Sequence, residues 1–232
     1  MSSDVAKDAD LGRIWFAGNP WPKGHRIIEA MWNAQLDPAT GLWFHLHLKT
    51  ADYDEDGFPD GEGDGDWTSP GTWHNYHACT LSSREWQGEF PGFLAAGLGQ
   101  PLHLSEIADH TFRVDAGHTR ANTFEPAFGI YLTGHDSVAD HTLRFSPRAD
   151  SLFDLDWRGK VALSYAGDDD FDYQFHAEVR SLRFDRIGVP ADTDPAQLLE
   201  VVAALLPETG EWRPGEAVLA PGYRPAPALV RR

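Results

Sequence analysis

The chain has 232 residues, 41% of them hydrophobic, which is enough to bury a substantial core. Its formal net charge of −17 argues against nucleic acids and anionic membranes as partners, because phosphate groups are bound through clustered Lys and Arg. Cys79 is the only cysteine, so no intrachain disulfide can form. Neither a signal peptide nor an apolar membrane span is visible, and we expect a soluble, cytoplasmic protein.

A β-hairpin is predicted between Arg26 and Thr50. Apolar residues occupy every second position from Arg26 to Leu36 and again from Leu42 to Thr50, with a Pro- and Gly-containing turn at 37–41. A period of two residues is typical of strands with one buried face. The face predicted to be buried comprises Ile28, Ala30, Trp32, Ala34, Leu36, Leu42, Phe44, Leu46 and Leu48.

The opposite face of this hairpin, which we call the Trp43 face, is polar and aromatic. It carries Trp43, His45, His47, Lys49, Glu29 and Asn33. An exposed tryptophan beside hydrogen-bonding groups is typical of a surface that binds a carbohydrate by stacking, or a protein, since Trp is enriched at interface hot spots. The alternative is that further strands or the C-terminal segment cover this face and its residues are ordinary packing.

The histidines of the Trp43 face allow a second interpretation. His45 and His47 are two residues apart on a strand, so both imidazoles leave the same side and could approach one zinc or iron ion. His25, His74 or His77 would supply a third ligand. The alternative is a pair of solvent-facing histidines without a metal, because a His pair with no specified third ligand is a weak signal.

The acidic segment after the hairpin has the spacing of a calcium-binding loop. Between residues 52 and 66, eight residues are Asp or Glu and four are Gly. Alternate carboxylates can converge on one hard cation, and Gly57 in the sixth position permits the sharp turn that follows. The predicted ligands are Asp52, Asp54, Asp56, the Phe58 carbonyl and Asp60, with Glu62 or Asp64 completing the set.

This loop differs from an EF-hand in two respects. Its twelfth position is Gly63 in place of the bidentate Glu, and its flanks are predicted strands instead of helices. We therefore expect calcium in a structural role on a β scaffold. The alternative is a solvated acidic loop that binds no ion.

Short strands are predicted along most of the remaining chain. They cover residues 72–81, 102–107, 111–114, 128–133, 142–145, 152–157, 160–165 and 173–187. Arg158-Gly159 is predicted to form a tight turn between two of these strands. The segment 82–101 is predicted to be a loop that contributes Phe90, Phe93 and Leu94 to the core.

One helix is predicted, over residues 194–206. Asp194 is a suitable N-cap, Pro195 occupies the first helical position, and apolar residues recur until Pro207. The tail after Gly210 is rich in proline and is expected to lie extended on the surface or to fray.

These elements predict an all-β fold, a mostly antiparallel β-sandwich, jelly roll or barrel, with one C-terminal α-helix. We expect residues 1–190 to form a single β-sandwich-like domain. Residues 191–232 would be the helix and the Pro-rich tail, packed on that domain or trailing from it.

The motifs favour binding over catalysis. The sequence has no Gly-x-Ser-x-Gly elbow and no Gly-rich phosphate loop, and Cys79 is expected to be a small buried hydrophobe. We therefore predict a binding or interaction module whose Trp43 face meets a small neutral ligand such as a carbohydrate, or a protein surface. Two alternatives are a metal-dependent hydrolase or oxygenase that uses His45 and His47, and an acidic antagonist of a basic protein.

Overall fold

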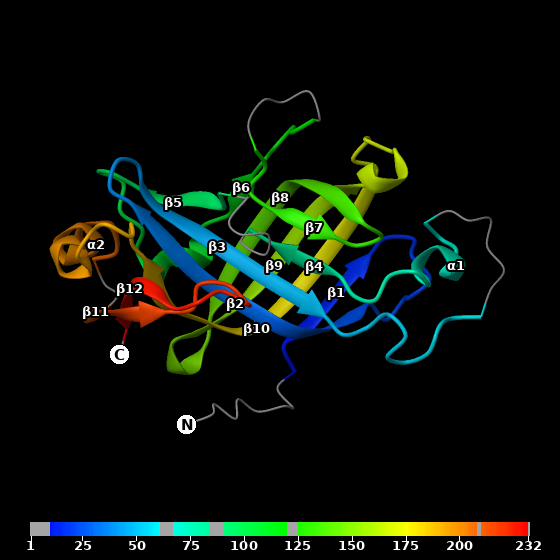
Figure 1. Ribbon diagram of the computed structural model, residues 1–232, viewed down its shortest axis with the longest axis horizontal. Coiled ribbons are helices and arrows are strands. Elements are labelled where there is room, and N and C mark those ends of the chain that lie inside the picture. Colours follow the sequence, from blue (N-terminus) through cyan, green and yellow to red (C-terminus); the bar gives the residue numbers. More distant parts are fainter. Residues whose placement is uncertain (1–9, 61–66, 84–90, 120–124, 208–209, 232) are drawn as a thin grey trace.

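The computed structural model describes residues 10–60, 67–83, 91–119, 125–207 and 210–231 (Figure 1). Its strands are β1 (Gly12–Phe16), β2 (His25–Asp37), β3 (Gly41–Thr50), β4 (Thr80–Ser82), β5 (Phe93–Gly97), β6 (Phe112–Val114), β7 (Gly129–Tyr131), β8 (His135–Pro147), β9 (Leu152–Ala162), β10 (Tyr173–Gly188), β11 (Trp212–Ala217) and β12 (Ala226–Arg231). The α-helices are α1 (Pro70–Trp73) and α2 (Leu199–Leu205), and the 3₁₀ segments are η1 (Leu104–Asp109), η2 (Ala149–Ser151), η3 (Ser164–Ala166) and η4 (Pro195–Leu198). The predicted class, mostly antiparallel β-sheet with one C-terminal helix, is confirmed.

The strand pairings return to their starting point. The order β1-β2-β3-β4-β7-β8-β9-β10 continues into β12 and β11, and β10 also pairs with β1 and β2. One edge of β10 therefore contacts β9 and then β12, while its other edge contacts β1 and then β2. This long strand joins the N-terminal, central and C-terminal parts of the sheet.

The predicted hairpin is present, with one irregularity. β2 and β3 pair in antiparallel fashion from Ile27 opposite Thr50 to Asp37 opposite Gly41. The register shifts between Ile27 and Glu29, and this bulge leaves Ile28 46% exposed instead of buried. A bulge adds one residue to one strand, which reverses the faces on either side of it.

Aromatic rings dominate the core enclosed by the strands. Trp32 of β2 stacks on Phe145 of β8 at 4.4 Å between ring centroids and lies 4.7 Å from Phe184 of β10. Phe44 and Phe153 meet the same indole edge-on, each at 5.1 Å. Edge-to-face and offset contacts of this kind add to the free energy gained from burying the apolar surface.

Two predicted strands take other forms. Residues 72–81 contain the end of α1, an irregular stretch and the short β4, because Pro70 begins a helical turn whose Trp73 is fully buried. Most of 102–107 lies in η1, where Leu104 and Ile107 face the core three residues apart. Apolar spacing alone does not distinguish a short strand from one helical turn.

The predicted turn at Arg158-Gly159 is wrong, because β9 runs through it. Arg158 pairs with Thr142 of β8 on one side and with His176 of β10 on the other. Gly159 serves close packing instead: a Cβ there would lie 2.6 Å from the Phe175 ring and 2.8 Å from His141 Nδ1. A glycine inside a strand marks such a close approach as readily as a turn.

The C-terminal segment is part of the sheet. The Asp194 side chain accepts a hydrogen bond from the Ala196 N–H and caps η4, which leads into α2 as predicted. After it, β11 and β12 pair with each other, and β12 pairs with β10. The described tail is therefore ordered, in contrast to the extended or frayed tail predicted from its prolines.

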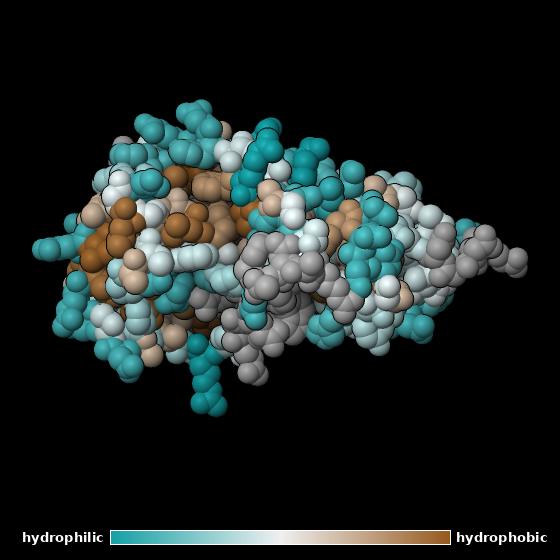
Figure 2. Space-filling model, turned by 90° about the horizontal axis from the view of Figure 1, so that it is seen from above, coloured by the Kyte–Doolittle hydropathy of each residue, from teal (hydrophilic) through white to brown (hydrophobic). Residues whose placement is uncertain are grey.

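The helices lie at opposite ends of the molecule. α2 is beside β11 and β12, and α1 is at the far end near the connection from β1 to β2 (Figure 1). Apolar surface gathers at the α2 end of the face seen in Figure 2, and most of the remaining described surface there is polar. Within the described ranges, no helix is long and apolar enough to cross a membrane.

Candidate functional site: a groove on the outer face of three strands

Outward-facing side chains of β1, β10 and β9 form rows across the three strands. The register places Trp15 opposite His176, and His176 opposite Arg158. We call these three residues the Trp15 row. Two residues further along, Gln174 lies opposite Lys160, and we call this pair the Gln174 row. The residues between the rows point into the core, since successive side chains of a strand alternate.

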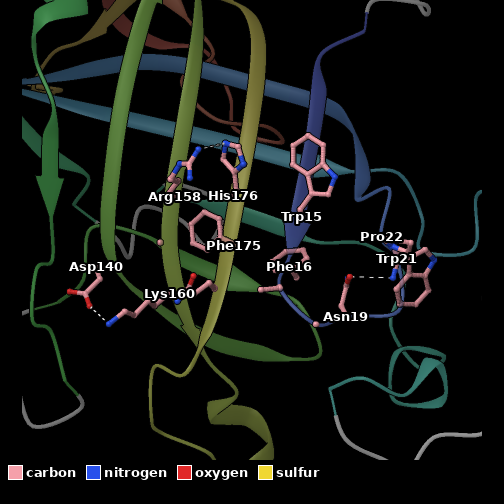
Figure 3. A pocket seen from close by; sticks show the side chains of 14 residues that line it. Trp15, Phe16, Asn19, Trp21, Pro22, Asp140, Arg158, Lys160, Phe175 and His176 are labelled. Atoms are coloured by element: carbon pink, nitrogen blue, oxygen red, sulfur yellow. Dashed lines mark hydrogen bonds and ion pairs between the residues drawn. The ribbon is translucent and has the colours of Figure 1, made fainter.

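A groove of about 510 Å³ lies over both rows (Figure 3). Its further walls are Asn19, Trp21 and Pro22 in the connection after β1, and Asp140 of β8. We call it the Trp15 groove. Its volume falls within the range of sites that hold small molecules, and its mixture of aromatic and polar lining is typical of them.

Trp15 has a defined position on this face. Its indole packs on the backbone of Gly24, where a Cβ would come within 2.6 Å of Trp15 Cδ1. The His176 ring lies beside it, with 5.6 Å between the centroids and 30° between the planes. The two rings therefore form one aromatic surface along the groove. The Trp15 indole N–H donates to no other described residue and remains available to a ligand.

Asp156 fixes the polar end of the Trp15 row. Its Oδ1 accepts a 2.9 Å hydrogen bond from Arg158 Nε, and its Oδ2 lies 2.7 Å from His176 Nε2. Burial alone would raise the pKa of Asp156, but the hydrogen bonds from Arg158 and His176 outweigh it and lower the pKa. The carboxylate thus stays ionised and orients both neighbours.

The Gln174 row combines a free amide with a neutralised cation. Gln174 is exposed, and its side chain makes no hydrogen bond within the described part of the chain. Lys160 Nζ lies 2.8 Å from Asp140 Oδ2, and this bond raises the pKa of Lys160 and lowers that of Asp140. Two ammonium protons of Lys160 remain for other partners.

The loop wall of the groove is anchored from beneath. Asn19 accepts a hydrogen bond from the Trp21 N–H and donates from Nδ2 to His25 Nε2 at 3.0 Å. Burial, assisted by the nearby Arg13, lowers the pKa of His25 to about 4, so the ring is neutral at neutral pH and can accept the hydrogen bond from Asn19. The Trp21 indole contacts His25, Tyr53, Phe58 and Trp73. These contacts pack the wall against the aromatic core.

Among the described residues of the predicted calcium loop, no three carboxylates are grouped to hold an ion. Glu55 is paired with Arg26, and its pKa is lowered by that hydrogen bond. Gly57 adopts φ +82°, the turn conformation expected of it. Asp52, Asp54, Asp56 and Asp60 are exposed, and Phe58 packs on His74 at 3.9 Å. Glu62 and Asp64 lie outside the described residues.

The Trp43 face is largely covered. His45, His47 and Asn33 are 4%, 5% and 3% exposed. Asn33 donates to the Leu219 carbonyl at 2.6 Å, and His45 Nδ1 lies 3.1 Å from Ser83 Oγ. For these three residues the alternative therefore holds: they are covered by other parts of the chain, which include the C-terminal segment at Asn33.

The remaining members of the Trp43 face do not form a joint surface with them. Lys49 is exposed and Glu29 is half-buried, its Oε1 3.7 Å from His47 Nε2. Trp43 is half-buried and donates from Nε1 to Thr40 Oγ1 at 2.9 Å. Trp43 instead lines a second groove, of about 520 Å³, together with Phe93 and Phe112, apart from the three buried members of the face.

No metal centre is formed by the described side chains: within those ranges, no three His, Cys, Asp or Glu residues are grouped to hold an ion. Burial, with Lys49 nearby, lowers the pKa of His47 to about 4, which keeps it neutral. Cys79 is fully buried, as predicted, and burial raises the pKa of its thiol. It is therefore inert as a nucleophile.

The Trp15 groove could not be predicted from the sequence for two reasons. The first is that the sequence predicts two strands, 152–157 and 160–165, with a turn at Arg158. A residue in a turn has no place on a strand face, so Arg158 is not expected beside other outward-facing side chains. The pairing of β1 with β10 joins residues more than 150 positions apart, such as Trp15 and His176, and no local pattern indicates it. The alternation Arg13-Ile14-Trp15-Phe16 did contain the signal that Trp15 faces outward.

The site must be interpreted from its own geometry, since no protein-family model, no curated protein and no solved structure matches this chain.

Proposed function

We propose that the protein is a binding module that holds a carbohydrate in the Trp15 groove. The observation that carries the proposal is the Trp15 row, in which an indole lies beside an arginine and a histidine oriented by one carboxylate. A sugar ring has an apolar C–H face and an edge of hydroxyl groups. The indole suits the face, and the Arg158 guanidinium and the Asp140 carboxylate, which both line the groove, suit the edge.

The charges of the groove favour a neutral ligand. Arg158 is neutralised by Asp156, and Lys160 by Asp140. An anion or a cation would have to compete with one of these pairs, whereas hydroxyl groups can both donate to the carboxylates and accept from the cations. The ligand class predicted from the sequence is thus retained, and its site moves from the Trp43 face to the Trp15 groove.

The proposal is tested by titration calorimetry with the full chain. The probes are glucose, galactose, mannose, N-acetylglucosamine and their homo-oligomers of two to four units. At least one should bind, and Trp15→Ala should weaken it tenfold or more. Trp43→Ala is the matched control and should bind as the wild type does. If none of these probes binds, or if only Trp43→Ala abolishes binding, the proposal is wrong.

A further inference from the structure

The Trp15 groove extends over two rows of side chains, and each row has its own binding groups. At the first row, Trp15 and His176 provide an aromatic surface that ends at Arg158. At the second row, the groove is floored by Gln174 and lies between Asn19 on the loop side and Lys160 on the β9 side. Figure 3 shows Trp15, His176 and Arg158 at one level of the strands, and Asn19 and Lys160 at a second level below them.

The spacing of the rows is set by the strands. Positions two residues apart on a strand are separated by about 6.6–6.8 Å. This distance is comparable with the size of one sugar ring, so a single ring that stacks on Trp15 would leave Gln174 without a partner. A chain of sugars lying along the strands would contact both rows at once.

We infer that the ligand of the Trp15 groove is an oligosaccharide of at least two units, with one unit on the Trp15 row and the next on the Gln174 row. This inference rests on the proposed carbohydrate function. Between Gln174 and the loop wall the β1 strand ends and Ala17 follows, which is too small to fill the space over the second row. The sugar unit on the Trp15 row makes most of the stacking contact, and the unit on the Gln174 row adds hydrogen bonds to the Gln174 amide and the Lys160 ammonium.

The covalent link between the two sugar units determines how much more tightly a disaccharide should bind than a monosaccharide. Once the first unit is bound, contact of the second becomes intramolecular, so a disaccharide gains affinity over the monosaccharide from contacts that are weak when separate. We expect the best disaccharide of the panel to bind at least tenfold more tightly than its monosaccharide.

The inference is tested by calorimetry with the monosaccharide and disaccharide of the sugar that binds best. Gln174→Ala should remove most of the tenfold gain of the disaccharide and leave the monosaccharide affinity unchanged. Arg158→Gln should weaken both probes. Gln100→Ala, at an exposed glutamine far from the groove residues, is the matched control and should change neither.

Two other outcomes are distinguishable. Equal affinities for the monosaccharide and disaccharide, unaffected by Gln174→Ala, would overturn the two-unit site and leave the carbohydrate function standing. A complete lack of binding by every member of the panel would overturn both. Because Gln174 is exposed, circular dichroism of the variant should match the wild type, so a lost gain cannot be attributed to misfolding.

Discussion

The Trp15 indole rests directly on the backbone of Gly24, with no room for a methyl group between them. A Cβ at Gly24 would lie 2.6 Å from Trp15 Cδ1 and 2.7 Å from the Ile14 carbonyl oxygen, and the φ of Gly24 is +68°. The connection from β1 to β2 thus supports the ring that dominates the groove. A substitution in this connection should therefore lower both the free energy of unfolding and the affinity for the ligand.

Gly24→Ala should therefore destabilise the protein by roughly 2–4 kcal/mol, from a strained φ and from displacement of Trp15. Urea denaturation measures this loss. Gly99→Ala is the matched control, because Gly99 has a φ of +79° but no atom lies within 4 Å of the place that its Cβ would take. The control should lose only the backbone component, about 1 kcal/mol. Equal losses in the two variants would contradict the close contact with Trp15.

The variant Gly159→Ala tests the energetic cost of overpacking without a contribution from backbone strain. Gly159 has no positive φ, but its added methyl group would collide with the Phe175 ring at 2.6 Å and with His141 Nδ1 at 2.8 Å. Overpacking of this kind costs about 1–3 kcal/mol. Thermal and urea denaturation should both show the loss. A variant as stable as the wild type would mean that Gly159 does not contact these rings.

Asp156→Asn should weaken carbohydrate binding without unfolding the protein. The amide cannot provide the paired acceptor that binds Arg158 and His176, so both side chains lose their fixed orientation. Calorimetry should show a loss of about tenfold in affinity, which corresponds to about 1.4 kcal/mol. Asp154→Asn is the control, because Asp154 lies on the same outer face but bonds Arg148 and the Ser181 N–H instead of Arg158 and His176. Unchanged affinity in Asp156→Asn would remove Asp156 from the site.

Stability should fall as the pH drops from about 6.5 toward 4. Burial lowers the pKa of His25 and His47 to about 4 and that of His141 to about 3. In this window the unfolded chain binds protons that the folded chain excludes, so protonation favours unfolding. Asp115 and Asp136, whose pKa values are raised by burial, oppose the trend.

The variant His141→Gln measures how much one histidine contributes to this pH dependence. In the wild type, Trp157 Nε1 donates to His141 Nδ1 at 3.2 Å, and the side-chain oxygen of Gln can accept in its place. The slope of unfolding free energy against pH between 6 and 4.5 should decrease by up to about 1.4 kcal/mol per pH unit. An identical slope in variant and wild type would show that His141 takes up its proton in the folded state.

The calcium prediction for the acidic loop is checked by melting temperature with calcium and with EDTA. If the acidic loop closes on calcium as predicted from its sequence, the ion should raise the melting temperature of the wild type, since an ion that binds only the folded state stabilises it. The double variant Asp54→Asn, Asp56→Asn should lose that increase while melting normally in EDTA. Identical melting of the wild type in both solutions would contradict a calcium site.

The sequence predicted those parts of the fold that depend on neighbouring residues. The hairpin of β2 and β3, the strand β10 and the helix beginning after Asp194 follow from alternation and capping within one segment. The burial of Asn33, His45 and His47 could not be decided from the sequence, because it depends on distant parts of the chain. Asn33, for example, donates to the Leu219 carbonyl, 186 residues away. The Trp15 groove was missed for the same reason, since its rows exist only through long-range register.

The most direct test of the proposed carbohydrate site is an NMR titration that monitors the indole N–H signals of the nine tryptophans. The Trp15 and Trp43 signals are assigned with Trp15→Phe and Trp43→Phe, and the full chain is titrated with the disaccharide that binds best. We predict that the Trp15 signal shifts with saturation while the Trp43 signal stays in place. A shift of Trp43 with an unchanged Trp15 signal would contradict the account and return the site to the β2–β3 hairpin.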